Sequence, residues 1–180
     1  MSVSRLFLPL SLLALAGACV PSPAPAPPPS PAPPRPEPSQ APPSVVTPTY
    51  DNWMDAPQTP GDWFYSKTTQ GSAARFGAPQ SEARFSVVCD RARSTVSLVR
   101  SASSPVAVPM RVRTETADRV LSAEPQGGQL PTLVATLPAR DSFLDAMAFS
   151  RGRFAVEISG VPTLYLPAWP EISRVVEDCR

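Results

Sequence analysis

The sequence predicts an α+β domain built mainly from antiparallel β-strands, as one sheet or a sandwich, with two short helices and one disulfide. Three observations indicate this fold class. Apolar and polar residues alternate in several short segments between residues 61 and 166, which is the spacing of half-buried strands. Two later segments carry apolar residues at helical spacing. Of the three cysteines, Cys89 and Cys179 fall on apolar faces of predicted elements.

The predicted strands cover residues 61–67, 83–90, 94–100, 106–114, 119–123, 133–137, 153–159 and 164–166. In the first of these strands, Trp63 and Tyr65 share one face. Short polar turns favour antiparallel hairpins, and residues 91–93 and 115–118 are turns of this kind. Pro125 and the two glycines after it are expected to end the strand that precedes them.

Two segments near the C-terminus predict helices. Asp141 is a suitable N-cap for the first, and Gly152 stands where that helix is expected to stop. Its apolar positions are Phe143, Leu144, Met147 and Ala148. The second helix begins near Pro170, and its apolar face comprises Ile172, Val175, Val176 and Cys179. Because Cys89 lies on the inward face of a predicted strand, we expect a Cys89–Cys179 disulfide that ties the C-terminus to the sheet.

Residues 1–18 predict an export signal. Arg5 precedes an apolar run at residues 6–16, which is shorter than the roughly 20 residues of a membrane span. Ala16 and Ala18 fit an ordinary cleavage site, but with Cys19 directly after them they also resemble the lipobox of bacterial lipoproteins. That resemblance implies a lipidated Cys19 and cleavage before it. Lipidation would leave an even pair of cysteines, which favours a lipoprotein over a secreted protein with an odd thiol.

Residues 19–48 form a segment dominated by Pro, Ala and Ser, with Arg35 and Glu37 as its charges. Such a composition cannot bury a core, so we expect a disordered, polyproline-like linker after the lipidated cysteine. An alternative is that this linker is itself a proline-rich ligand.

Residues 49–180 are long enough for one domain with a buried core. Acidic and basic residues nearly balance over the chain, with a formal net charge of +1. This balance argues against nucleic acid as a partner, because phosphate binding requires an excess of basic residues. The predicted partners are the membrane, through the lipid, and an envelope protein or peptidoglycan. In some bacteria an aspartate directly after the lipidated cysteine retains lipoproteins in the inner membrane. Val20 stands at that position here, which favours location in the outer membrane.

The composition also restricts the chemistry. The chain contains no histidine, which excludes Ser-His and Cys-His nucleophile systems and His-ligated zinc. The only lysine, Lys67, has Phe64 where a Ser-x-x-Lys pattern needs serine. Phosphate-binding glycine motifs and clustered calcium-binding carboxylates are also lacking. We therefore expect no enzymatic activity, no catalytic residue, no metal site and no cofactor.

Two weaker site hypotheses remain. The acids Asp141, Asp145, Glu157 and Glu171 could supply the carboxylate pair of a glycan hydrolase, but a cap, a solvated helix position, an outward strand position and a first-turn acid explain them as well. A possible binding patch consists of Arg140, Arg151, Arg153 and Arg174, which could hold a carboxylate or phosphate. The alternative is that these arginines cap the helix and pair with Glu177 or Asp178.

Four segments, residues 85–90, 137–141, 149–154 and 177–180, resemble a group of uncharacterised small lipoproteins from Gram-negative bacteria. A strand cysteine paired with one after a final helix is distantly similar in architecture to periplasmic accessory proteins associated with type VI secretion. The first resemblance implies no known activity, and the second implies a fold and a role in envelope assembly. We therefore expect a lipid-anchored, periplasm-facing binding or assembly module. The alternatives are an inhibitor of a cell-wall hydrolase and a glycan hydrolase.

Overall fold

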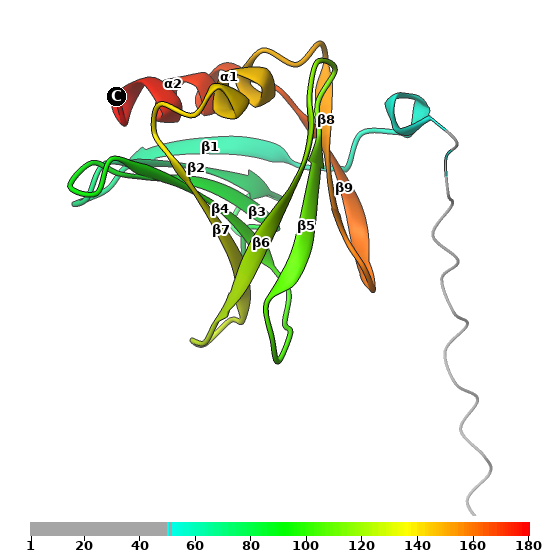
Figure 1. Cartoon of the computed structure of the whole chain (residues 1–180), viewed down its shortest axis with the longest axis horizontal. Helices are drawn as coiled ribbons and strands as arrows, with labels where there is room; N and C mark the ends of the chain where they lie inside the picture. Colours follow the sequence, from blue (N-terminus) through cyan, green and yellow to red (C-terminus); the bar gives the residue numbers. More distant parts are fainter. Residues whose placement is uncertain (1–49, 51) are drawn as a thin grey trace, which may run out of the picture. The chain divides into compact units, whose positions relative to one another are not determined.

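The computed structural model describes Tyr50 and residues 52–180, so the predicted signal, the lipidation site Cys19 and the proline-rich segment lie outside the described residues. Nine strands form one antiparallel sheet that curls into a half-barrel (Figure 1), in the order β1-β2-β3-β4-β7-β6-β5-β8-β9. The elements are η1 (Trp53–Asp55), β1 (Asp62–Lys67), β2 (Ser72–Gly77), β3 (Phe85–Asp90), β4 (Thr95–Ser101), β5 (Val108–Arg113), β6 (Asp118–Gln126), β7 (Thr132–Pro138), α1 (Ser142–Ala148), β8 (Arg153–Ile158), β9 (Val161–Pro167) and α2 (Pro170–Asp178). The predicted α+β class is confirmed, in its single-sheet form.

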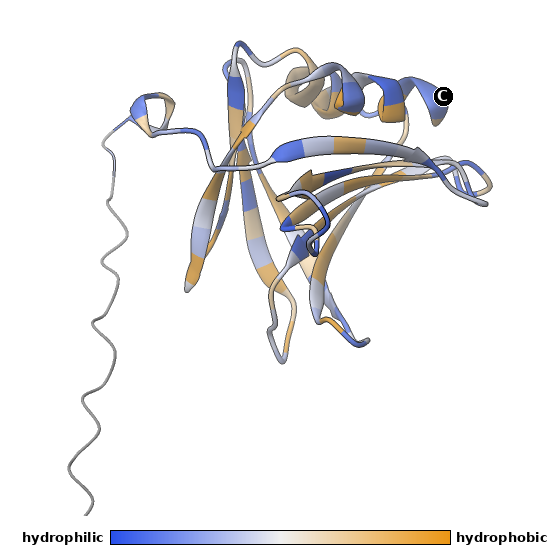
Figure 2. Cartoon of the chain, turned by 180° about the vertical axis from the view of Figure 1, so that it is seen from behind, coloured by the Kyte–Doolittle hydropathy of each residue, from blue (hydrophilic) through white to orange (hydrophobic). Residues whose placement is uncertain are grey.

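The expected hairpins are present. Strands β3 and β4 pair antiparallel, as do β5 and β6. The alternation of apolar and polar residues along the strands can be followed in Figure 2. On β5, Met110 and Val112 are fully buried in the core, whereas Arg111 and Arg113 lie on the other face of the strand. Alternation therefore sends one set of side chains into the half-barrel and the other to its outer face.

Strand β2 was not among the predicted strands. Its segment begins Ser-Ala-Ala, and Ser72, Ala73 and Ala74 are all fully buried, so neighbouring positions do not alternate between core and solvent. Helix α2 packs against this strand, which explains the small side chains there. A strand covered in this way carries no period-two signal in its sequence.

The predicted break at Pro125 is wrong, because β6 continues to Gln126. Its first part pairs with β5, where Ala123 lies opposite Val108. Its last residues pair with β7 instead, where Pro125 lies opposite Leu133. This change of partner carries the sheet around a corner and leaves Pro125 near the end of the strand, where a missing N–H is tolerated.

Helix α1 and strand β9 also differ in length from the prediction. Helix α1 ends at Ala148, several residues before Gly152. Strand β9 begins at Val161 and ends at Pro167, so it is longer than expected. The N-cap prediction is confirmed, because the carboxylate of Asp141 accepts a hydrogen bond of 2.8 Å from the N–H of Phe143.

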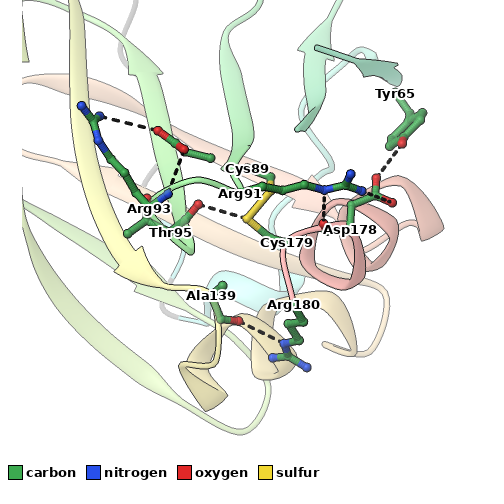
Figure 3. The surroundings of a disulfide bond; sticks show 10 residues. Tyr65, Cys89, Arg91, Arg93, Thr95, Ala139, Asp178, Cys179 and Arg180 are labelled. Atoms are coloured by element: carbon green, nitrogen blue, oxygen red, sulfur yellow. Dashed lines mark hydrogen bonds and ion pairs between the residues drawn. A yellow bond between two sulfur atoms is a disulfide. The ribbon is translucent and has the colours of Figure 1, made fainter. Parts of the chain in front are cut away.

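Helices α1 and α2 lie side by side across one end of the curled sheet (Figure 1). The predicted disulfide is confirmed: Cys179, directly after α2, is bonded to Cys89 on β3, with 5.4 Å between their Cα atoms (Figure 3). Nearby, the side chain of Arg91 donates to the carbonyl of Asp178, and the hydroxyl of Tyr65 donates to its carboxylate. The C-terminal helix is therefore attached to the sheet by a covalent bond and several polar contacts.

The two outer strands of the sheet also approach each other at one point. The Trp63 indole N–H donates to the carbonyl of Pro167 at 2.9 Å. Thr59 and Tyr165 exchange two hydrogen bonds of 2.9 Å, one to the Thr59 hydroxyl and one from its N–H. Within the described part of the chain, no helix is both long and apolar enough to cross a bilayer.

Candidate functional site

A pocket of about 660 Å³ opens on the outer face of the sheet, beside η1. It is lined by Tyr50, Trp53, Arg113, Glu157, Ile158, Ser159, Gly160, Val161, Pro162, Thr163 and Tyr165. We call it the β8–β9 pocket, because most of these residues belong to β8, β9 and the turn between them. Its volume lies in the usual range for sites that bind small ligands.

The strand pairing explains why polar side chains gather in this pocket. On the strands β5, β8 and β9, the residues Val112, Val156 and Leu164 face the core and are buried. The residues next to them along each strand therefore point to the outer face of the sheet. Because β8 pairs with both β5 and β9, Arg113 and Glu157 meet on the outer face of the sheet.

Four charged side chains form a network on the outer face of the sheet, and two of them, Arg113 and Glu157, line the pocket. Arg111 binds Asp118 through two hydrogen bonds, of 2.9 Å from its Nε and 2.5 Å from its Nη2. Arg113 donates from Nη1 to Oε1 of Glu157 at 3.3 Å. Two longer ion pairs, Arg111–Glu157 at 3.8 Å and Arg113–Asp118 at 3.6 Å, connect these two hydrogen-bonded pairs to each other. Two positive and two negative charges thus neutralise one another.

The hydrogen bonds between Arg111 and Asp118 favour the charged forms of both side chains. The hydrogen bond from Arg111 holds the pKa of Asp118 below its usual range, and nearby Arg113 acts in the same direction. The same hydrogen bond raises the pKa of Arg111. Consequently Asp118 stays a carboxylate at neutral pH.

Aromatic rings form the walls of the pocket. The rings of Tyr50 and Tyr165 meet edge to face, with centroids 6.2 Å apart, and both are half-buried. Trp53 is buried, and the Arg113 guanidinium lies 5.8 Å from the centroid of its ring. Burial, together with the negative charge of Glu157, raises the pKa of the Tyr165 hydroxyl. That hydroxyl therefore stays protonated and can both donate and accept hydrogen bonds.

The four arginines of the predicted binding patch have different neighbours in the structure. Arg151 is paired with Glu115 at 3.5 Å, a partner that neither interpretation of the patch named. Arg153 donates to the backbone carbonyl of Ala56. The remaining two also differ: Arg174 stacks 3.9 Å above the centroid of Tyr65, and Arg140 is exposed.

The four candidate carboxylates are likewise spread over the domain. Asp141 caps α1 and is paired with Arg119 at 2.8 Å. Asp145 is paired with the C-terminal Arg180 at 2.9 Å, and Glu171 lies in the first turn of α2. Of the four, Glu157 alone lines the β8–β9 pocket. Among the described residues, no group of three or more acidic or cysteine side chains is placed to hold a metal ion.

The comparisons with family models, with curated proteins and with solved structures found no match for this chain. The site must therefore be interpreted from its own residues.

Sequence reasoning did not single out Tyr50, Arg113 or Tyr165. The alternation along β5 indicated that Arg113 points away from the core, and the same was expected of Glu157. What the sequence did not contain was the pairing of β5 with β8, two strands that are separated by 39 residues, 114–152. A pair of outward charges of opposite sign on two strands is a signal only after that pairing is known.

Proposed function

We propose that this protein is a lipid-anchored binding module of the bacterial cell envelope, without catalytic activity, and that the β8–β9 pocket is its binding site. The observation that carries the proposal is the pocket itself, a concave site with aromatic walls and a charged base on the outer face of the sheet. Pockets with apolar walls and a few convergent polar groups are the usual form of a ligand site.

The N-terminal sequence supports the anchored location. Residues 1–18 and Cys19 have the pattern of a lipoprotein signal. The Cys89–Cys179 disulfide agrees with an oxidising compartment such as the periplasm. Several acyl chains on one cysteine would hold the protein stably on a bilayer.

The glycan hydrolase has less support than a binding role. Most glycoside hydrolases use two carboxyl groups that flank the scissile bond. Among the described residues that line the β8–β9 pocket, Glu157 is the sole carboxylate, and it contacts two arginines. The hydrolase inhibitor would be favoured by a protruding polar loop, and the pocket instead favours binding of a small ligand.

The anchoring is tested by cell fractionation. The wild-type protein should sediment with the membrane fraction, preferentially the outer membrane on a density gradient. The Cys19→Ala variant should move to the soluble periplasmic fraction, because no thiol remains to be lipidated. If Cys19→Ala still sediments with membranes as the wild type does, lipid anchoring is contradicted.

The binding site is tested by photo-crosslinking in intact cells. A photoreactive amino acid replaces Thr163 in the pocket, and in the matched control it replaces Gln126, an exposed residue outside the pocket. We expect adducts from position 163 that disappear when Tyr165→Ala is added, and none of these adducts from position 126. Equal labelling from both positions, or none from position 163, would contradict binding in the pocket.

A further inference from the structure

The ligand chemistry of the β8–β9 pocket can be inferred from its charge balance, its hydroxyl groups and its rings. This inference rests on the proposed function, because it concerns the same site.

The charged side chains at the pocket balance one another. Arg111 and Arg113 are balanced by Asp118 and Glu157, and each of the four contacts an opposite charge within 4 Å. An anionic ligand would have to compete with the carboxylates for the arginines, and a cation would have to compete with the arginines for the carboxylates. Since neither exchange adds a net ion pair, the pocket favours an uncharged ligand.

The edge of β9 offers little room for a peptide strand. An extended peptide could bind by adding a strand to the free edge of β9. That edge is already used: Tyr165 exchanges two hydrogen bonds with Thr59, and the carbonyl of Pro162 accepts a 3.2 Å hydrogen bond from the Arg100 guanidinium. Backbone groups of β9 that a strand would need are therefore occupied at two points.

The pocket presents hydrogen-bonding groups and aromatic faces to an uncharged ligand. Hydroxyl groups line it at Ser159, Thr163 and Tyr165, and the carboxylate of Glu157 has lone pairs beyond those that its arginines use. The half-buried rings of Tyr50 and Tyr165 provide faces with partial negative charge, against which C–H groups pack favourably. Hydroxyl partners beside aromatic faces match a sugar ring, which has polar edges and C–H faces.

We infer that the β8–β9 pocket binds a neutral saccharide unit of an envelope glycan. The Tyr165 ring packs against the sugar, and its hydroxyl, kept protonated, exchanges hydrogen bonds with the sugar hydroxyls. Glu157, held in place by Arg113, accepts a further hydroxyl hydrogen bond.

The test uses the mature full-length protein in detergent, titrated with a trimer of N-acetylglucosamine and followed by calorimetry. We expect saturable binding that Tyr165→Ala weakens by about tenfold or more, which corresponds to the loss of a well-placed aromatic contact. Tyr165→Phe keeps the ring and the fold, and should weaken binding by roughly threefold through the lost hydroxyl. The matched control Phe149→Ala removes a ring that is 71% exposed and lies outside the pocket, and should leave the affinity unchanged.

Salt provides a second readout. Because the ligand carries no charge, the dissociation constant should change by less than about twofold between 50 and 500 mM NaCl. Failure of the trimer to bind, loss of affinity in high salt, or equal effects of Tyr165→Ala and Phe149→Ala would overturn the saccharide assignment. If the adducts from position 163 persist in that case, the pocket still binds a ligand in cells and only its chemical class is wrong.

A charged peptide probe tests whether the pocket binds peptides in place of saccharides. A tripeptide with a free carboxylate is titrated under the same conditions. No measurable binding of the tripeptide is expected. Tight tripeptide binding that Tyr165→Ala abolishes, without binding of the saccharide, would assign the pocket to peptides and overturn the inference.

Discussion

Arg100 shows how one side chain can hold two distant strands together. It lies on β4 and is 6% exposed. Its guanidinium donates to the backbone carbonyls of Arg84, Ser101 and Pro162, at 2.9, 2.8 and 3.2 Å. Burial lowers its pKa, and the neighbouring charge of Arg84 adds to this effect. The side chain therefore joins β4, in the middle of the sheet, to Pro162 of β9, a residue that lines the pocket.

Replacing Arg100 by methionine should destabilise the domain. Arg100→Met removes the donor from three carbonyl groups, of which the Arg84 carbonyl keeps a hydrogen bond from the N–H of Ser101, and each lost hydrogen bond to a charged donor is costly. We expect the free energy of unfolding, measured with urea, to fall by about 2–4 kcal/mol. The matched control Arg140→Met changes an exposed arginine and should stay within about 0.5 kcal/mol of the wild type. Similar values for the two variants would refute the bridging role of Arg100.

At the scale of elements, the sequence predicted those strands and helices whose periodicity is simple. Strands β4 and β5 and helix α2 each bury one face, so their apolar residues recur at fixed spacing. Strand β2 has no such signal, because small residues are buried at neighbouring positions of the strand. Strand β6 was cut short at Pro125, because a proline usually ends a strand and only the change of pairing partner allows it here.

The contact between the loop before β2 and the disulfide gives a prediction at this scale. A Cβ atom added at Gly71 would lie 2.7 Å from the carbonyl oxygen of Cys89 and 2.9 Å from its sulfur. Gly71→Ala should therefore force the disulfide and the backbone apart. We expect the free energy of unfolding, measured by thermal denaturation, to fall by about 1–3 kcal/mol. The control Gly127→Ala adds a Cβ with nothing within 4 Å and should unfold at the wild-type temperature or slightly above it. Equal melting temperatures for both variants would contradict the close approach at Gly71.

At the scale of the whole molecule, the sequence predicted the fold class and the Cys89–Cys179 bond, but not the pocket. The disulfide could be predicted because Cys89 continues the apolar face of its strand and Cys179 continues the apolar spacing of the helix before it, and both are buried. The pocket depends on long-range pairing, since it needs β5 beside β8 and the N-terminal segment with Trp53 against both. Local periodicity does not encode such neighbours, which is why the sequence did not indicate the pocket.

The stability of the whole domain should depend on pH through its paired carboxylates. Arg111 lowers the pKa of Asp118, and hydrogen bonding from Tyr65 lowers that of Asp178. Because these pKa values are lower in the folded than in the unfolded protein, the unfolded state binds more protons in acid. The free energy of unfolding should stay level from pH 7 to about pH 5 and fall below about pH 4.

Urea titrations at several pH values measure this dependence. The variant Asp178→Asn should be less stable than the wild type at neutral pH and should lose less stability on acidification. A wild-type protein that becomes more stable between pH 5 and pH 3 would contradict the role of these ion pairs.

An intact mass spectrum of the mature protein examines the two covalent features on which its location and fold rely. We expect a chain that begins at Cys19, carries acyl groups on that residue, and is lighter by two hydrogens for the Cys89–Cys179 bond. Alkylation without reductant should add nothing to either of these two cysteines. An unmodified Cys19, or free thiols at positions 89 and 179, would contradict a disulfide-tied domain anchored to the membrane by lipid.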